Sequence, residues 1–207
     1  MTSQSPVRTT INSYNKTVHN YHARTKKLHL TATAKQFTSS LQPGARILDL
    51  GCGPGRDAKI FSHEGFTVVG IDLSKEMIRA ARQLATTAMF RIMDMRKLSF
   101  RANTFDGIWS CASLLHLPKK DLPRALAEAR RVLKTGGIFS LCVKKGKGEA
   151  MLPDARYNGA PKFWSFFSKA ELHSFIKKAG LTIVNCFIDT PTHGYATNPW
   201  ICVFCKK

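Results

Sequence analysis

The residues best suited to chemistry form a glycine cluster after one carboxylate, in the order Asp49-x-Gly51-x-Gly53-x-Gly55. The apolar run 45–50 predicts a strand and residues 56–64 predict a helix, so the cluster is a strand-to-helix turn. Glycines let such a turn approach a ligand closely, and open α/β sheets bind ligands at the carboxyl ends of their strands. A GxGxxG dinucleotide fingerprint would need glycine at position 56, where Arg56 stands.

Two further carboxylates end the next predicted strands. Asp72 ends strand 67–72, 21 residues after Gly51, where a carboxylate can accept hydrogen bonds from two ribose hydroxyls. Strand 88–93 leads into Asp94, whose carboxylate could accept from an adenine amino group while a neighbouring backbone N–H reads the ring. The three features together predict a nucleoside site at one edge of the sheet.

In this order and spacing, with the run Phe105-Asp-Gly-Ile-Trp and the turn Leu133-Lys-Thr-Gly-Gly, the sequence resembles the class I, Rossmann-like S-adenosylmethionine-dependent methyltransferases. The resemblance covers roughly residues 14–207. It implies S-adenosylmethionine as cofactor and S-adenosylhomocysteine as product. It places the three glycines at the methionine end, Asp72 at the ribose and Asp94–Met95 at the adenine, and adds as further cofactor contacts Cys52, Leu73, Met77, Ser110 and Cys111. For Asp49, a structural role and a direct contact are equally compatible with the pattern.

The N-terminal segment Tyr14-Asn-Lys-Thr-Val-His-Asn-Tyr21 resembles the YDxxAxxY lid helix of the same family, with departures at Asn15 and Val18. The two tyrosines are seven residues apart and share one helical face. We expect them to close over the cofactor, where an aromatic ring favours the sulfonium cation. The alternative is that both rings only dock an amphipathic helix.

Methyl transfer from a sulfonium is an in-line displacement, so positioning and exclusion of water matter most, and a base is needed only where the acceptor loses a proton. His116, in the stretch after the predicted strand 105–111, is the candidate catalytic residue, as base or as orienter. The competing interpretation is a loop histidine with ordinary hydrogen bonds.

A long connection, residues 144–167, carries the candidate substrate-binding residues Arg156, Tyr157 and Trp164. Aromatic side chains there could wall an apolar pocket while the arginine pairs with a carboxylate or phosphate of the acceptor. They could equally pack the connection onto the sheet edge. A loop of this length is more often functional than idle.

Strands alternate with helices along the rest of the chain, after a helical segment at about 11–39. A helix at 121–134 stops at Gly136–Gly137, strand 138–143 follows, and the capping box Ser168 to Glu171 opens a helix ending at Gly180. The last strands, 181–187 and 200–205, have no helix between them and predict an antiparallel hairpin. The expected fold is α/β, a doubly wound, seven-stranded, mostly parallel sheet with an antiparallel C-terminal hairpin and an N-terminal helical lid. We expect one domain over 1–207, with 1–42 as lid and 43–207 as core.

The charge is the unusual bulk property, with 32 Lys and Arg against 13 Asp and Glu, a net charge of +19. It leaves two acceptor hypotheses open: a small molecule, which we favour from the compact length and aromatic lid, or tRNA or rRNA bound by the basic surface. A third hypothesis is a protein that binds S-adenosylmethionine without transferring its methyl group. The pair Cys202 and Cys205 has CxxC spacing without a second ligand pair, so core packing is preferred to a metal site. We expect a cytoplasmic monomer or homodimer with no membrane segment and no metal.

Overall fold

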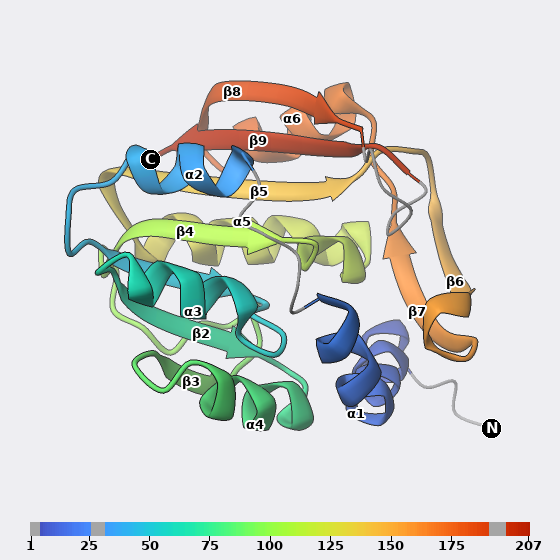
Figure 1. The fold of residues 1–207 in the computed structure, drawn as a ribbon. Coiled ribbons are helices and arrows are strands. Elements are labelled where there is room, and N and C mark those ends of the chain that lie inside the picture. The colour runs from blue at the N-terminus through green and yellow to red at the C-terminus, as the bar shows by residue number, and fades with distance from the viewer. Residues whose placement is uncertain (1–4, 26–31, 191–197) are drawn as a thin grey trace.

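A computed structural model describes residues 5–25, 32–190 and 198–207, and its main feature is a seven-stranded sheet (Figure 1). The strand order is β3-β2-β1-β4-β5-β9-β8. The parallel strands are β1 (Arg46–Leu50), β2 (Thr67–Asp72), β3 (Met89–Ile92), β4 (Phe105–Cys111) and β5 (Leu133–Lys144). The antiparallel strands are β8 (Thr182–Asp189) and β9 (Trp200–Lys206). The predicted mixed sheet with an antiparallel C-terminal pair is therefore confirmed.

Helices cover both faces of this sheet. One face carries α2 (Ala32–Ser39), α3 (Arg56–His63) and α4 (Lys75–Leu84), packed around Phe37, Phe61 and Trp109. The other face carries α5 (Leu122–Val132) and α6 (Lys169–Lys178). The helix α1 (Pro6–Thr25) lies instead beyond the carboxyl ends of the parallel strands (Figure 1), which is the edge where open α/β sheets bind ligands.

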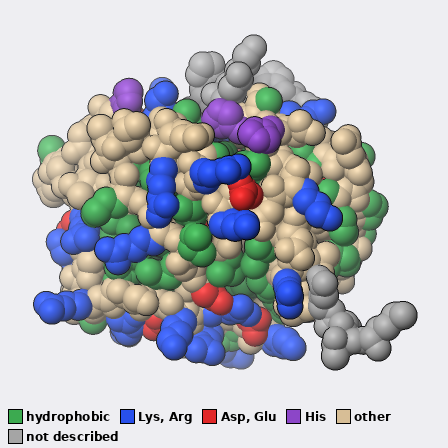
Figure 2. Space-filling model, turned by 90° about the horizontal axis from the view of Figure 1, so that it is seen from below, with side chains coloured by type: hydrophobic (Ala, Val, Ile, Leu, Met, Phe, Trp, Pro, Cys, Tyr) green, Lys and Arg blue, Asp and Glu red, His purple; other side chains and the backbone are tan. Residues whose placement is uncertain are grey.

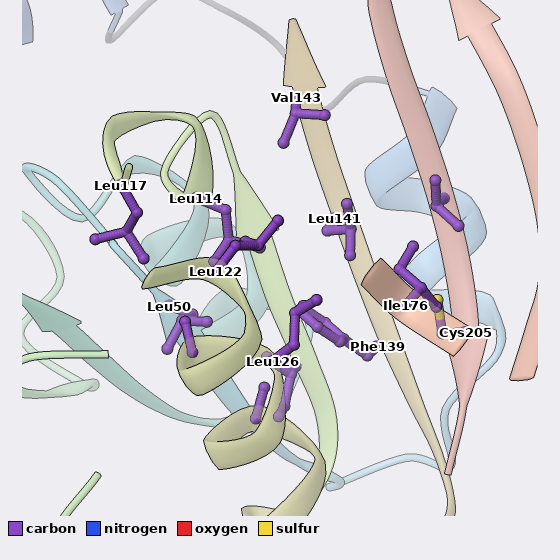
Figure 3. Close-up of a cluster of buried hydrophobic side chains, with 14 of the residues drawn as sticks. Leu50, Leu114, Leu117, Leu122, Leu126, Phe139, Leu141, Val143, Ile176 and Cys205 are labelled. Atoms are coloured by element: carbon purple, nitrogen blue, oxygen red, sulfur yellow. The ribbon is translucent and has the colours of Figure 1, made fainter. Parts of the chain in front are cut away.

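The larger hydrophobic core lies between the sheet and the helices α5 and α6 (Figure 3). Leu122 and Leu126 of α5 pack with Phe139 and Leu141 of β5, all fully or almost fully buried. Complete burial of side chains of this size stabilises the fold by roughly 1.5 to 3 kcal/mol each. This packed layer gives the strand ends a rigid base. Cys205 belongs to this core and Cys202 is buried nearby on β9, as the packing interpretation predicted.

The connection after β5 is a hairpin rather than a loop. Its strands β6 (Glu149–Asp154) and β7 (Ala160–Ser165) pair antiparallel as a separate two-stranded sheet, and a short 3₁₀ helix, η3 (Ala155–Tyr157), joins them. The prediction of a long loop over 144–167 was therefore wrong. Pro153 and Pro161 stand opposite each other in the hairpin, and proline is tolerated there because a two-stranded ribbon leaves outward edges unpaired.

The bounds of two helices differ from the predictions, whereas the start of a third is as predicted. The N-terminal helix begins at Pro6, where the missing N–H costs nothing, and part of the predicted helix 11–39 falls in residues 26–31, outside the described structure. Helix α5 ends at Val132, before Gly136–Gly137, because Leu133 already pairs with Phe105 of β4. The capping box is confirmed, since the Ser168 hydroxyl accepts the Glu171 N–H at 3.1 Å.

Candidate active site

The predicted glycine turn connects β1 to α3. Gly51 has a φ of +84°, and the N–H groups of Gly51 and Cys52 both donate to the Ile71 carbonyl at 2.8 and 2.9 Å. A Cβ atom on Gly51 would lie 2.3 Å from the Ser113 Cβ. The turn therefore requires glycine here for both its left-handed backbone and its close approach to the segment after β4.

The third glycine of the cluster has a different task. Gly55 caps α3 with a φ of +82°, and a Cβ there would meet Ala81 of α4 at 3.0 Å. Gly51, Cys52 and Gly53 line the cavity at the sheet edge, whereas Gly55 faces the packing between α3 and α4 and does not line it.

Asp72 joins the glycine turn to the start of α4. Its Oδ2 accepts the Gly53 N–H at 3.1 Å and its Oδ1 accepts the Ser74 N–H at 2.8 Å. Burial raises the pKa of the Asp72 carboxyl, and these backbone donors partly offset the increase. Each oxygen keeps acceptor capacity toward the cavity that Asp72 lines.

A second carboxylate, Asp49, lies deeper in the cavity and is only 3% exposed. Within the described part of the chain its Oδ2 has no hydrogen-bond partner. Burial, together with the nearby charges of Asp57 and Asp72, raises its pKa well above the ordinary value. A buried acceptor oxygen without a partner is unfavourable, so this atom is suited to receive a ligand's donor.

Arg56 and Asp57 also line the cavity, and the sequence prediction did not include them. The Arg56 guanidinium binds Asp57 through Nε at 2.6 Å and Nη2 at 3.0 Å, while Trp109 Nε1 donates to the same carboxylate at 2.9 Å. The only available signal was that arginine occupies the position of the third glycine in a dinucleotide motif.

The apolar part of the cavity surrounds the end of β3. Leu73, Met77, Met93 and Met95 line it, together with Ile71 from β2. Flexible thioether side chains of this kind adapt to the faces of flat ring systems. Three of these residues, Leu73, Met77 and Met95, were predicted as cofactor contacts.

Asp94 does not line the cavity. Arg96 binds its carboxylate through Nε at 3.0 Å and Nη2 at 2.7 Å, and also donates to Asp121 at 2.8 Å. Although burial opposes the effect, the Arg96 hydrogen bonds lower the pKa of Asp94. The predicted pairing of Asp94 with an adenine amino group would require a change in this ion pair.

The helix α1 closes the cavity from outside. Tyr14 and Tyr21 both line it, with ring centroids 5.5 Å apart in an edge-to-face arrangement. Asn15, a departure from the lid pattern, accepts hydrogen bonds from the Ser74 hydroxyl at 2.8 Å and the Glu76 N–H at 3.3 Å. This contact ties the lid to the first turn of α4. Further lining residues from the same helix are Val7, Thr10, Ile11 and Thr25.

His116 ends η1 (Leu114–His116), the 3₁₀ helix that follows β4. Its Nδ1 lies 2.7 Å from the Phe163 carbonyl oxygen and its Nε2 lies 2.8 Å from the Tyr14 hydroxyl. A carbonyl oxygen only accepts, so Nδ1 carries the proton. Burial, with the neighbouring cations of Lys162 and Lys144, lowers the pKa of His116 to about 3. The neutral ring therefore presents an unprotonated Nε2, and Tyr14 donates its hydroxyl proton to it.

This depressed pKa predicts an acid-sensitive fold. The unfolded chain binds a proton at His116 below about pH 6.5, whereas the folded chain does so only near pH 3, so this contribution to stability falls as pH drops between these values. In His116→Gln the amide can accept from Tyr14 and donate to Phe163 without titrating. We expect the urea midpoint to decline more steeply for the natural protein than for this variant between pH 7 and 5. Equal slopes would contradict the buried, neutral histidine.

The three predicted substrate-binding residues lie behind the lid and do not line the cavity. Trp164 packs against His116 with ring centroids 4.7 Å apart and ring planes tilted by 54°, and the Tyr157 and Tyr21 ring centroids are 5.6 Å apart. The Arg156 guanidinium pairs with Asp154 at 2.8 Å. The structure thus brings these side chains to the lid residues rather than to the cavity wall.

Of the two residues predicted at the end of β4, only Cys111 lines the cavity. Ser110 is buried beside Ser113, with the two hydroxyl oxygens 2.7 Å apart. Since Ser113 donates its proton to the Leu50 carbonyl at 2.5 Å, Ser110 is the donor of the pair. The two serines hold the segment after β4 against the end of β1.

Comparison with known proteins agrees with this architecture. Residues 47–137 match the family described as a methyltransferase domain. A 2-methyl-6-phytyl-1,4-hydroquinone methyltransferase of Synechocystis sp. is 34% identical over 118 residues, covering 55% of this chain and 36% of that protein. The malonyl-[acyl-carrier protein] O-methyltransferase of Salmonella typhimurium is 33% identical over 108 residues, covering 52% and 39%. The chain spans about a third to a half of the length of its curated relatives.

Solved structures share the fold over almost the whole chain. A methyltransferase from Methanosarcina mazei superposes with a TM-score of 0.77 at 22% identity, covering 87% of this chain and 99% of that one. The 1,6-didemethyltoxoflavin-N1-methyltransferase of Burkholderia thailandensis, solved with S-adenosylhomocysteine, gives 0.78 at 20% identity, covering 100% and 92%. The fold and the site define a methyltransferase domain. Residues 47–137 carry the signature of that domain, and the chain as a whole has the fold of the class I, Rossmann-like methyltransferases that use S-adenosylmethionine.

Two observations of the structure indicate that the cavity residues fit this cofactor. The unpartnered Asp49 Oδ2 offers a buried acceptor for an ammonium group such as that of the methionine moiety. The approach of Ser113 to Gly51 leaves no room for a side chain at the turn, so a ligand meets backbone there. Asp72 would then hold the ribose hydroxyls, and the methionine side chains around Met95 would contact the base.

Proposed function

We propose that the protein transfers a methyl group from S-adenosylmethionine to a small-molecule acceptor. The observation that carries the proposal is one cavity whose lining includes both the glycine turn with Asp72 and the lid residues Tyr14 and His116. When bound, the cofactor would supply a methyl group on a positively charged sulfur. The sulfur–carbon bond would break as a lone pair of the acceptor bonds to the methyl carbon. The chain's own task is to align the acceptor and exclude water.

The acceptor end of the cavity is the part under the lid. Apolar side chains of α1 and of the residue that follows η1 line it, namely Val7, Ile11 and Leu117. A cavity enclosed by a helical lid and lined by apolar side chains together with polar groups such as Tyr14 and His116 suits a small molecule better than a polynucleotide strand. The name of one curated relative, a 2-methyl-6-phytyl-1,4-hydroquinone methyltransferase, supports the same class.

Tyr14 and His116 act together in this proposal. Because the Tyr14 proton is donated to His116, the hydroxyl oxygen can serve an acceptor molecule only as a hydrogen-bond acceptor. A hydroxyl, amine or thiol acceptor in the cavity would donate to that oxygen, which would turn the acceptor's lone pair toward the methyl group. The proton that the acceptor loses on methylation would pass to solvent water. His116, with a pKa lowered to about 3 by burial, is a positioning residue here rather than a base at neutral pH.

The RNA hypothesis would rest on the net charge of +19. Figure 2 shows Lys and Arg side chains scattered over one face of the molecule, with apolar and uncharged surface between them. Several of the basic residues are also engaged in ion pairs, including Arg96, Arg131 and Lys134. A groove that follows a phosphate backbone would need a continuous basic track.

Transfer of a tritiated methyl group tests the proposal. The protein is incubated with labelled S-adenosylmethionine and a cell extract separated into RNA and small-molecule fractions, at low and at physiological salt. We expect label in the small-molecule fraction, with little dependence on salt. Label in RNA that disappears as salt rises would replace the proposal with the RNA alternative, because phosphate contacts weaken steeply with ionic strength. Transfer to neither fraction would contradict both hypotheses.

A further inference from the structure

A buried lysine of β7 lies directly behind the lid. The side chain of Lys162 is fully buried, and its Nζ lies 3.8 Å from the ring centroid of Tyr157, 4.3 Å from that of Tyr14 and 5.9 Å from that of Tyr21. An ammonium within about 6 Å of an aromatic face is attracted by the ring quadrupole, most strongly where water is excluded. Lys162 is therefore enclosed by aromatic rings from two separate parts of the chain.

The charge of Lys162 is balanced by one carboxylate. Asp154 Oδ2 lies 3.1 Å from Lys162 Nζ, and the same carboxylate binds Arg156 at 2.8 Å. Asp154 is itself buried, and although burial opposes the effect, the Arg156 and Lys162 cations lower its pKa to about 2. Asp154 is therefore charged at neutral pH and anchors the ammonium in the hairpin.

The enclosed ammonium links the hairpin to the cavity. Tyr14 and Tyr21 line the cavity, while Lys162 and Tyr157 belong to the hairpin and its 3₁₀ turn and do not line it. The backbone on either side of Lys162 is attached to α1 as well, since Ser13 donates to the Pro161 carbonyl at 2.5 Å and Thr10 accepts the Phe163 N–H at 2.9 Å. Lys162 is thus the charged centre of the contact that holds the lid.

We propose that Lys162 is a positioning residue that holds Tyr14 and Tyr21 at the cavity, so that its ammonium raises the affinity for S-adenosylmethionine without touching it. The inference rests on the proposed function, since it assumes that the cavity holds that cofactor. It also changes the role expected for the tyrosines. The Lys162 ammonium lies over one face of the Tyr14 ring, so that face is not available to a ligand cation.

The chain contains a matched control. Lys144 at the end of β5 is also buried, its Nζ lies 3.7 Å from the Trp164 ring centroid, and burial lowers its pKa to about 8, as for Lys162. Trp164 does not line the cavity. Removing either ammonium removes a buried cation from an aromatic face, but only Lys162 contacts rings that line the cavity.

The test compares Lys162→Met with Lys144→Met by calorimetric titration of S-adenosylmethionine and by thermal unfolding. We expect Lys162→Met to weaken binding at least fivefold and Lys144→Met less than twofold, with comparable losses of melting temperature. Equal changes in affinity for the two variants, or none in either, would overturn the proposal. If Lys162→Met does not fold, Lys162→Gln is assessed by the same criteria.

A double-mutant cycle separates positioning from general destabilisation. If Lys162 acts through Tyr14, Lys162→Met should weaken binding much less in a Tyr14→Leu background than in the natural protein. If the two losses of S-adenosylmethionine affinity simply multiply in the double variant, the substitutions act independently, and this result would contradict a role of Lys162 through Tyr14. Failure of the natural protein to bind S-adenosylmethionine would instead overturn the proposed function itself, and that result is seen before any variant is compared.

Discussion

Replacing Asp72 with alanine is expected to weaken the binding of S-adenosylmethionine at least tenfold, which corresponds to about 1.4 kcal/mol. The substitution removes the acceptors proposed for the ribose hydroxyls and also leaves the N–H groups of Gly53 and Ser74 without their partner. A buried donor that loses its partner costs roughly 1 to 3 kcal/mol. Calorimetric titration measures the affinity, and unchanged affinity would contradict the assignment of the site.

Asp106 provides the control for this substitution. It also accepts a backbone N–H, from Arg46 at 2.9 Å, and pairs with Lys134 at 2.7 Å, but it does not line the cavity. Asp106→Ala should therefore reduce stability while leaving the cofactor affinity within about twofold. An equal loss of affinity in both variants would show that Asp72 acts only through the stability of the fold.

Replacing Gly51 with alanine is expected to have the largest effect on the fold. At a φ of +84° an L-residue is strained, and its Cβ would lie 2.3 Å from the Ser113 Cβ. Strain and overpacking together should lower the free energy of unfolding by roughly 2 to 5 kcal/mol. Ser113 must move to make room, which shifts the segment leading to His116, so cofactor affinity should fall at least tenfold as well.

Gly65→Ala separates the contribution of backbone strain from that of overpacking. Gly65 has a φ of +89°, but a Cβ there would meet nothing within 4 Å. The Gly65→Ala variant should therefore lose only the backbone-strain part of the free energy of unfolding, about 1 to 2 kcal/mol, and its cofactor affinity should be unchanged. Urea unfolding and calorimetry measure both quantities. Equal losses in the two alanine variants would contradict the close contact between the glycine turn and Ser113.

The parallel core could be predicted from the sequence because its signals are local. Strands 67–72 and 105–111 were predicted with the bounds the structure gives, since each is a short apolar run ended by residues that break the pattern. The glycine turn and Asp72 were predicted for the same reason. Their positions relative to one another follow from the rule that parallel strands end at one edge of a sheet.

The β6–β7 hairpin could not be predicted because its sequence hides the strand signal. It contains two prolines, Pro153 and Pro161, with glycines just before it and in its turn, all of which favour turns. The hairpin forms because it packs on α1, with Thr10 and Ser13 bonded to its backbone. Such support between segments about 150 residues apart leaves no pattern in either segment alone.

The site residues that the sequence mispredicted or missed have similar explanations. Asp94 has the position expected of a base-binding carboxylate, but the sequence does not reveal that Arg96, two residues later, curls back onto it. Arg156 was predicted to meet an acceptor, yet Asp154 binds it in the same way. In both cases a charged side chain two residues away occupies the place that the ligand was expected to fill. The cavity residues Val7 and Ile11 were missed because only the docking of α1 brings them there.

Other expectations are not tested by the structure. None of the helices in the described part of the chain combines the length and the apolar character that a bilayer crossing requires. The cytoplasmic location, the oligomeric state and the single-domain boundaries 1–207 stay predictions. The oligomeric state and the domain boundaries matter for the proposed chemistry only if a second subunit or another segment contributes residues to the cavity.

Calorimetric titration of the natural protein with S-adenosylmethionine, and in parallel with a nicotinamide dinucleotide, tests the assignment of the cavity. We expect saturable binding of S-adenosylmethionine at one site per chain, competition by S-adenosylhomocysteine, and no binding of the dinucleotide, because Arg56 interrupts the glycine fingerprint that dinucleotide-binding turns need. Binding of the dinucleotide, or no saturable binding of S-adenosylmethionine, would contradict this assignment.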